Sequence, residues 1–292
     1  MSVTERDPVS GFATTGHDWN GIKELNSPIP RVVVWFMAVT HVYAVIAWVL
    51  FPTWPLGQTY TKGLLGGDQQ QAVAADIAAA TAARADWMSE LATQDFDSLR
   101  ADPDLMAPAL ATAEPLFGQN CQVCHGAGGM GGPGFPRLND GVWLWGGTAE
   151  EIETTLRFGI NSPHPDTRFA QMPAFGRDGL LPRPEILALT EYVLTLGNGV
   201  IPGDTSAAAT LFQDNCAGCH GEDAKGLEGT GAPNLTDADW IYGGDAATIR
   251  QTLLAGRQGV MPAWQGRLTD AELRMMALYV ESLADKGAKD AP

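Results

Sequence analysis

The segment Asn120-Cys121-Gln122-Val123-Cys124-His125-Gly126 decides the fold of this chain, because an equivalent segment, Asn215-Cys216-Ala217-Gly218-Cys219-His220-Gly221, follows 95 residues later. Cys-x-x-Cys-His is the pattern of covalent haem c attachment: both thiols add to the haem vinyl groups as thioethers, and the histidine ring binds the iron. We therefore predict two covalently bound haem c groups, attached through Cys121, Cys124, Cys216 and Cys219 and ligated by His125 and His220.

Two other readings of these motifs compete with haem attachment. A redox-active dithiol does not need a histidine after the second cysteine, and it is expected within a β-α-β unit, which this sequence does not show. A zinc site would need further Cys or His ligands at a suitable spacing, and the chain has only these four cysteines. Haem attachment uses all four thiols and leaves none for a disulfide.

The likeness between the two segments continues downstream, which identifies an internal repeat. The equivalent positions are Pro136 and Pro233, Leu138 and Leu235, Trp143 and Trp240, Gly159 and Gly256, Met172-Pro173-Ala174 and Met261-Pro262-Ala263, and Tyr192 and Tyr279. We predict two cytochrome c domains at residues 108–200 and 201–292, with Pro202-Gly203 joining the two copies.

The same helices are expected in each copy, separated by loops rich in Gly and Pro. Apolar periodicity predicts helices around each Cys pair, over 148–158 and 246–254, and over 183–196 and 269–283. Thr269 and Glu272 form a capping box, and Pro184 suits a first helical turn. The fold class is therefore all-α: one N-terminal transmembrane helix followed by two tandem cytochrome c domains.

Each copy also supplies a methionine that could complete the iron coordination. Met172 follows His125 by 47 residues, and Met261 follows His220 by 41 residues, both in a Met-Pro-Ala context. A thioether is a soft, neutral ligand that stabilises ferrous iron relative to a second histidine. We predict Met172 as the ligand of the first haem and Met261 as that of the second. His164, in the same loop as Met172, is the alternative for the first haem, but the second copy has no counterpart.

Several further side chains could lie near the haems. Met130, Met275 and Met276 are interpreted as core residues. The aromatic residues that could wall the haems, or belong to an ordinary core, are Trp143, Trp240, Tyr192 and Tyr279. The arginines that could pair with haem propionates are Arg137, Arg168 and Arg257. The sequence leaves both questions open.

Composition excludes some functions and favours others. The chain has 292 residues with 18 Lys plus Arg against 34 Asp plus Glu, a net charge of −16, and almost all of this excess follows residue 60. Such a field repels phosphate backbones, so no nucleic acid partner is expected. It favours a donor with a basic face, for which the C-terminal domain is the more natural entry; the alternative is that the acidity only aids solubility.

An uncharged stretch from Val32 to Phe51 is long enough to span a bilayer. We predict an uncleaved anchor over 31–54, because a signal peptide would be shorter and a soluble core helix rarely runs so long without a charge. Lys23 and Arg31 precede it, so residues 1–30 are expected in the cytoplasm and the haem domains in the periplasm of a bacterial inner membrane. His41 inside the span is expected to contact another helix. Residues 55–107 are interpreted as a helical linker.

Taken together, the repeat, the anchor and the N-terminal segment resemble the CcoP/FixP family, the dihaem cytochrome c subunit (subunit III) of cbb3-type cytochrome c oxidase. The N-terminal pattern reads Asp18-Trp19-Asn20-Gly21-Ile22-Lys23-Glu24-Leu25-Asn26-Ser27-Pro28-Ile29-Pro30-Arg31, and the anchor ends in Phe51-Pro52-Thr53-Trp54-Pro55-Leu56. Asn20 stands where the family pattern leads us to expect an acid, which changes nothing in the mechanism.

The resemblance implies electron transfer from a periplasmic donor cytochrome c or a quinol-oxidising complex toward the oxidase core in aerobic or microaerobic respiration. The implied partners are a haem-copper catalytic subunit and a monohaem cytochrome c subunit. No catalytic residues are expected here, because the chain has no His cluster in a multi-span bundle. Two alternatives stand beside this reading. A dihaem peroxidase would need an open sixth position, and a free membrane-tethered shuttle would not need the patterned N-terminal segment.

Overall fold

The computed structural model describes residues 5–198, 206–227 and 229–290. The chain divides into two compact units, Met1–Ala83 and Arg84–Pro292. The predicted joint at Pro202-Gly203 lies outside the described residues.

The first unit begins with a β-hairpin that was not predicted from the sequence. Strand β1 (Thr14–Trp19) pairs antiparallel with β2 (Ile22–Leu25). Asn20 and Gly21 form its tip with φ of 58° and 91°, the left-handed conformation that a tight hairpin turn requires. The Asn-Gly pair was the available signal for this turn. The all-α class is confirmed for the chain as a whole, with this small sheet as an exception.

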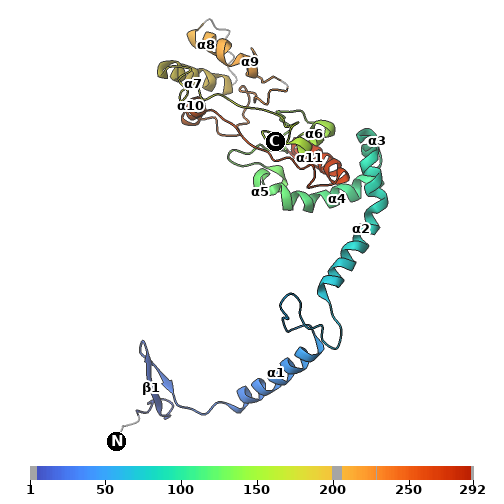
Figure 1. Cartoon of the computed structure of the whole chain (residues 1–292). Helices are drawn as coiled ribbons and strands as arrows, with labels where there is room; N and C mark the ends of the chain where they lie inside the picture. The colour runs from blue at the N-terminus through green and yellow to red at the C-terminus, as the bar shows by residue number, and fades with distance from the viewer. Residues whose placement is uncertain (1–4, 199–205, 228, 291–292) are drawn as a thin grey trace. The chain divides into compact units, whose positions relative to one another are not determined.

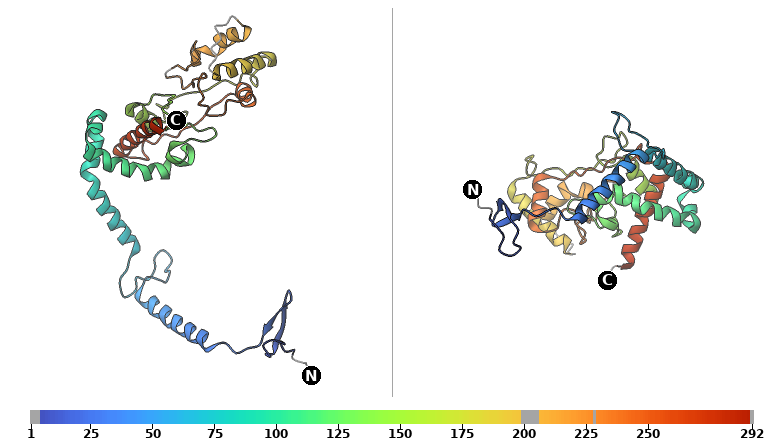
Figure 2. Two further views of the ribbon diagram at one scale, coloured as in Figure 1. Left: turned by 180° about the vertical axis from the view of Figure 1, so that it is seen from behind. Right: turned by 90° about the horizontal axis from the view of Figure 1, so that it is seen from below.

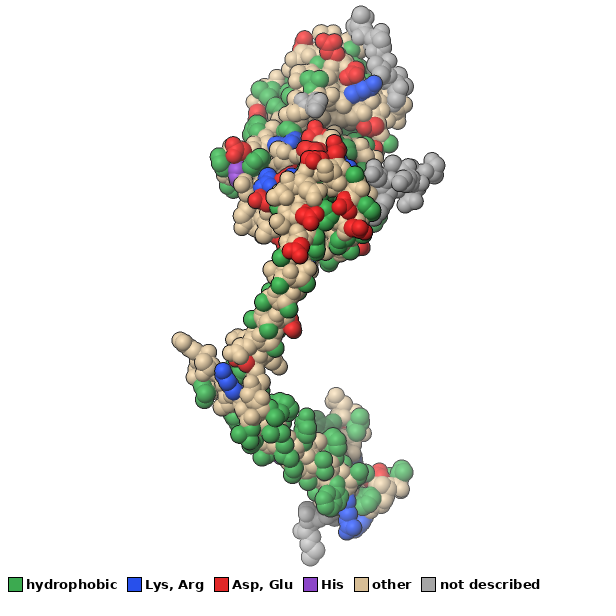
Figure 3. Space-filling view, turned by 90° about the vertical axis from the view of Figure 1, so that its right-hand side faces the viewer, with side chains coloured by type: hydrophobic (Ala, Val, Ile, Leu, Met, Phe, Trp, Pro, Cys, Tyr) green, Lys and Arg blue, Asp and Glu red, His purple; other side chains and the backbone are tan. Residues whose placement is uncertain are grey.

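Helix α1 (Arg31–Leu50) lies in the predicted anchor 31–54: it begins at the same residue and ends four residues earlier. Among the described residues it is the one helix long and apolar enough to cross a membrane, with a mean hydropathy of 2.1 over its most apolar window. Hydrophobic side chains cover it in Figure 3. His41 donates from Nδ1 to the Met37 carbonyl at 2.7 Å, so this polar ring is satisfied within its own helix.

The helices that follow match the predicted pattern. A long helix, α2 (Gln69–Thr93), runs from the first unit into the second. The second unit then contains α3 (Phe96–Ala101), α4 (Pro103–Asn120), α5 (Gln122–His125), a short 3-10 turn η1 (Ala127–Gly129), α6 (Ala149–Phe158), α7 (Arg183–Gly197), α8 (Ala207–Asn215), α9 (Ala217–His220), α10 (Ala246–Ala255) and α11 (Asp270–Asp290). Thr269 and Glu272 make the predicted capping box at the start of α11.

The second unit has two hydrophobic cores, and each core combines parts of both repeats. In the first core, α4 and α6 of the first repeat pack against α11 of the second. In the second core, α8 and α10 of the second repeat pack against α7 of the first. Figures 1 and 2 show these two groups of helices side by side. The segments 108–200 and 201–292 therefore remain a prediction about sequence repeats and do not coincide with the packed cores.

Two equivalent aromatic contacts join helices that belong to different repeats. Phe117 of the first repeat contacts Tyr279 of the second, with ring centroids 5.5 Å apart. Phe212 of the second repeat contacts Tyr192 of the first, also at 5.5 Å. The same helix pairing is thus made twice, and each time the two partners come from different copies.

The two segments that carry the methionines are joined to the other repeat by isolated backbone bridges. Met172 and Arg257 pair antiparallel, with N–H to carbonyl distances of 2.9 and 3.2 Å, and Ile160 pairs with Met261 at 2.9 Å in both directions. Gly159 and Gly256 have φ of +70°, and a Cβ on them would lie 2.4 Å from the Met261 carbonyl oxygen and 2.5 Å from that of Met172. The repeated glycine is therefore required where the segments cross.

The end of the predicted linker belongs to the first core rather than to a free stalk. Leu91, Phe96 and Leu99 are buried there against α11. Arg274 of α11 donates from Nε to the Leu91 carbonyl at 2.7 Å and from Nη2 to the Gln94 carbonyl, where α2 ends. These contacts hold the last turn of α2 on the first core.

Candidate haem attachment sites

Both Cys-x-x-Cys-His motifs occupy a sharp bend between two helices. Cys121 follows the last residue of α4, and its N–H donates to the Phe117 carbonyl at 2.8 Å; Cys216 follows α8 in the same way, with Phe212 as acceptor at 2.7 Å. The second cysteine and the histidine of each motif then lie on the short helices α5 and α9. All four cysteines are free thiols in the structure.

The two histidines share one orientation, set by a proline carbonyl. His125 Nδ1 lies 3.1 Å from the Pro136 carbonyl, and His220 Nδ1 lies 2.9 Å from the Pro233 carbonyl. A carbonyl only accepts, so Nδ1 carries the proton and Nε2 keeps a lone pair. Burial lowers the pKa of both histidines, against the opposing effect of this hydrogen bond, so the neutral ring that binds metals is favoured.

The first cysteine of each motif lacks the lowered thiol pKa of a redox-active dithiol. Burial, and to a smaller degree the neighbouring cysteine, raises the pKa of Cys121 and of Cys216 to about 11. A reactive Cys-x-x-Cys dithiol requires the opposite, a lowered thiol pKa. This environment argues against the dithiol reading, whereas thioether attachment needs no stable thiolate.

Each predicted methionine packs against the core that contains the attachment motif of the other repeat. Met261 packs against the first core together with Cys121, and Met172 packs against the second core together with Cys216. The predicted ligands stay predictions, and this packing favours an exchanged pairing, with Met261 near the first motif and Met172 near the second. The loop that carries each methionine continues into the terminal helix, and that helix packs in the other core.

The structure also places the three methionines interpreted as core residues, and His164. Met275 and Met276 are buried in the first core as predicted, but Met130 is 58% exposed, so its interpretation as a core residue is wrong. The side chain of His164 stacks on Phe158 with ring centroids 5.0 Å apart, and its Nδ1 accepts from the Asp166 N–H at 3.1 Å. These contacts tie His164 into its own loop.

The predicted aromatic and arginine residues lie at similar places in the two cores: one tryptophan packs on each core, and one arginine in each repeat lies over an aromatic ring. Trp143 packs on the first core and Trp240 on the second. Arg168 lies over the Trp145 ring at 5.2 Å and donates to the Trp145 carbonyl. Arg257 lies over the Tyr242 ring at 4.2 Å. Both arginines stand beside a methionine loop and remain candidates for pairing with propionates.

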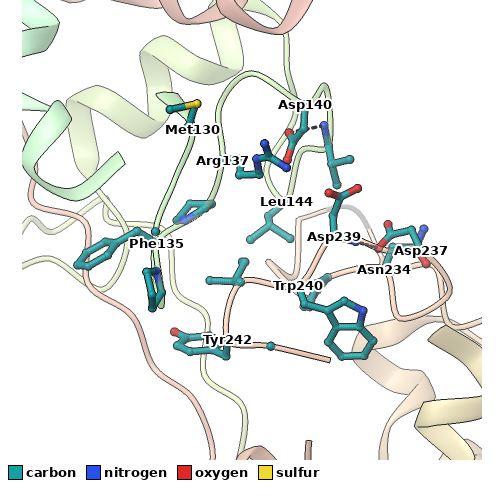
Figure 4. Close-up of a pocket in the computed structure, with 17 residues that line it drawn as sticks. Met130, Phe135, Arg137, Asp140, Leu144, Asn234, Asp237, Asp239, Trp240 and Tyr242 are labelled. Atoms are coloured by element: carbon teal, nitrogen blue, oxygen red, sulfur yellow. Dashed lines mark hydrogen bonds between the residues drawn. The ribbon is translucent and has the colours of Figure 1, made fainter. Parts of the chain in front are cut away.

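A cavity of about 460 Å³ lies between the loops that follow the two motifs (Figure 4). Pro136 and Pro233, whose carbonyls accept from the two histidines, both line it. Arg137 and the carboxylates Asp140, Asp237 and Asp239 line it as well. Asp140 and Asp237 occupy equivalent positions of the repeat, so their shared place in the sequence was the signal that could have marked them as candidates.

The residues present fit haem c at both sites. Each site combines two neighbouring cysteines, a histidine with Nε2 available for a metal, and a methionine from the facing loop. The helical fold and these motifs define a c-type cytochrome.

Comparisons with known proteins agree with this class. Residues 11–58 match the family model described as the N-terminal domain of cytochrome oxidase-cbb3, FixP. Residues 108–193 and 203–280 match the model for cytochrome c oxidase, cbb3-type, subunit III. The chain therefore belongs to the cbb3-type cytochrome c oxidase subunit III family.

Individual relatives align over almost the whole chain. A cbb3-type cytochrome c oxidase subunit FixP of Bradyrhizobium sp. (strain ORS 278) is 48% identical over 96% of this chain and 97% of its own length. A subunit CcoP of Azospirillum sp. (strain B510) is 44% identical over 97% and 99%. A subunit CcoP of Cereibacter sphaeroides is 45% identical over 92% and 94%.

Proposed function

We propose that this chain is the membrane-anchored dihaem subunit of a cbb3-type oxidase and carries electrons from a periplasmic donor cytochrome c, or from a quinol-oxidising complex, to the oxidase core. The observation that carries this is the duplicated site, in which a Cys-x-x-Cys-His bend, a proline carbonyl and a methionine loop recur with nearly equal geometry. The relatives bearing cbb3 oxidase names support the assignment to that complex.

The side chains divide the work of holding two haem c groups. Cys121 with Cys124, and Cys216 with Cys219, form the thioether links. His125 and His220 bind through Nε2, because the prolines hold Nδ1–H on the opposite side. Met261 completes the site of His125, and Met172 completes the site of His220. The bound iron supplies one-electron oxidation and reduction.

The surroundings of the histidines keep each site in one geometry during oxidation and reduction. Each Nδ1–H to carbonyl bond fixes the ring plane and increases the basicity of Nε2. The methionine segments are held by backbone hydrogen bonds to the other repeat, which would keep each sulfur in place beside a bound haem. A haem held by both a histidine and a methionine would suit electron transfer rather than substrate binding at the iron.

The partners proposed are a haem-copper catalytic subunit, a monohaem cytochrome c subunit and the membrane. The N-terminus is cytoplasmic and the second unit periplasmic, because positive charge concentrates before α1. A reporter enzyme that is active only in the cytoplasm should be silent when fused after Pro292 and active when fused before the anchor. The reverse pattern would overturn this orientation.

The haem content is tested on the purified full chain. Mass spectrometry should show two covalent haems, and one each after Cys121→Ser with Cys124→Ser or after Cys216→Ser with Cys219→Ser. Purification of the intact complex in mild detergent should recover the haem-copper and monohaem subunits. A chain that carries both haems and yet purifies alone would favour the free shuttle over the oxidase subunit.

A further inference from the structure

Met172 and Met261 lie on segments of unequal length, although both segments begin at an equivalent glycine. Met172 follows Gly159 by 13 residues, and Met261 follows Gly256 by five. Asn161, near the start of the longer segment, has φ of 50°, the left-handed conformation that asparagine tolerates better than most residues. The longer segment turns at Asn161 and forms a loop before it reaches its methionine.

Local hydrogen bonds close this loop. The Ser162 N–H donates to Thr167 Oγ1 at 2.9 Å, and the Thr167 N–H donates to the His164 carbonyl at 3.1 Å. The Asn161 N–H donates to the Arg168 carbonyl at 2.7 Å, which joins the two ends of the loop. These contacts all lie within the first repeat, so they hold the loop in shape without reaching the second repeat.

The side chain of Asn161 makes three hydrogen bonds and connects the two repeats. Its Oδ1 accepts from the Ala170 N–H at 3.2 Å, and its Nδ2 donates to the carbonyls of Ala170 and Gly259, both at 2.7 Å. A backbone N–H only donates and a carbonyl only accepts, so these partners fix which end of the amide carries the hydrogens. Both hydrogens on Nδ2 are thereby used.

The two carbonyls occupy matching places beside the predicted sulfur ligands. Ala170 stands two residues before Met172, and Gly259 stands two residues before Met261. Each methionine is itself bridged by backbone hydrogen bonds to the other repeat. The Asn161 side chain thus joins the segment that leads to one methionine to the segment that leads to the other.

We propose that Asn161 is a positioning residue for both predicted sulfur ligands, an inference that rests on the proposed function, in which Met172 and Met261 bind the two haems. An amide that bonds to both segments resists the movement by which either methionine would leave the iron. Loss of the amide should therefore weaken methionine binding at both haems. Loss of a contact within the loop should affect only the haem bound by Met172.

The test measures how fast imidazole displaces methionine from the ferric haems of the full chain. Chains that carry one haem, made by replacing Cys121 and Cys124 or Cys216 and Cys219 with serine, report the two sites separately. Asn161→Gly removes the side chain and keeps the left-handed backbone accessible, and Asn161→Asp keeps the shape but replaces the donating amide with an accepting oxygen. Each variant should speed displacement about fivefold at both haems, the factor expected for the loss of one ordinary hydrogen bond.

Two control variants separate this role from general loosening of the loop. Thr167→Ala removes a hydrogen bond inside the loop and should speed displacement only at the haem bound by Met172. Gln258→Gly changes the equivalent, exposed position of the second repeat and should leave both rates unchanged. A faster rate at only one haem in the Asn161 variants, or at neither, would overturn the inference. Equal acceleration at both haems by Thr167→Ala would overturn it as well.

Absorption spectra separate this inference from the function beneath it. Loss of the methionine-sulfur band from both haems in an Asn161 variant that still carries them would be the extreme form of the expected result. A band at both haems, with rates that do not respond to substitution of Asn161, would reject the positioning role and leave the proposed function intact. Absence of the band from either haem of the parent chain would instead contradict the proposed methionine ligation.

Discussion

The two cores of the second unit share their helix pairing but differ in what covers the terminal helix. On α11, the residues from Leu273 to Val280 are buried all round except Arg274, because α4 and α6 lie on one side and the end of α2 with α3 on the other. On α7, only the side toward α8 and α10 is buried. Leu187, at the position equivalent to Arg274, is 41% exposed. Equivalent repeat positions therefore differ in burial according to their neighbours.

The attachment sites differ in charge as well. No charged residue occurs from Pro115 to Pro136 around the first motif. Around the second, Asp214, Glu222 and Asp223 are exposed, with Lys225 as the only basic group among them. The acidity of the sequence is thus unevenly distributed between two sites of equal geometry, which agrees with the expectation that the second site receives electrons from a basic donor.

The largest expected effect comes from breaking the exchange of methionines. In a chain that attaches haem only at His220, because Cys121 and Cys124 are replaced by serine, Met172→Ala should abolish the methionine-sulfur absorption band completely. Met261→Ala in the same chain should leave the band in place. The reciprocal pair, with Cys216 and Cys219 replaced by serine, should give the reverse result.

Absorption spectra of the ferric protein measure this directly. If Met261→Ala rather than Met172→Ala removes the band from the haem on His220, the crossed pairing is wrong. If neither variant removes the band, a different methionine is the ligand. Absence of the band from the haem on His125 in the otherwise unchanged chain would return His164 as the candidate ligand of that haem.

The second prediction tests the joint between α2 and the first core. Arg274 is largely buried, lies 4.2 Å from the Phe96 ring centroid, caps the end of α2 and lies 3.6 Å from the Glu153 carboxylate. Arg274→Ala leaves those carbonyls and Glu153 without this partner and should lower the free energy of unfolding by about 2 kcal/mol. Denaturant unfolding of the haem-loaded chain measures the loss.

The equivalent residue of the other core is the control for this prediction. Leu187→Ala on α7 should change the free energy of unfolding by no more than about 0.5 kcal/mol, because no stalk covers it. Equal effects at the two positions would mean that the end of α2 does not stabilise the first core.

The smallest effect concerns the carboxylates of the cavity. Burial, followed by the charges of Asp239 and Asp140, raises the pKa of Asp237. Its contribution to stability is therefore fully present below the ordinary aspartate pKa and is lost as pH rises through the raised value. Asp237→Asn should slightly raise the melting temperature at pH 7, and the gain should vanish toward pH 4.

Scanning calorimetry at the two pH values checks this expectation, with exposed Asp214→Asn as the control. The amide introduced by Asp237→Asn keeps an oxygen that can accept from the Asp239 N–H, as the Asp237 carboxylate does, so the local turn is retained. A variant that is less stable than the parent at pH 7 would show that the ionised carboxylate has a favourable partner.

Much of this architecture follows from local sequence. The attachment motifs, the capping box at Thr269, the apolar run of α1 and the repeated helices could all be identified, because each depends on residues a few positions apart. Asn20-Gly21 carries an equally local signal for the hairpin, although the hairpin was not predicted. The two haem-attachment motifs and their histidines belong to this category.

The pairing between the copies could not be read in the same way. Phe117 and Phe212 can each pack against Tyr192 or Tyr279, since the repeats present nearly the same surfaces. The local sequence pattern is the same whether the terminal helix of each repeat packs on its own repeat or on the other one. Only the path of the chain between Gly159 and Met172, and between Gly256 and Met261, selects one of them. The tertiary structure thus decides which methionine packs against which core, because that choice depends on contacts between segments about a hundred residues apart, such as Ile160 with Met261.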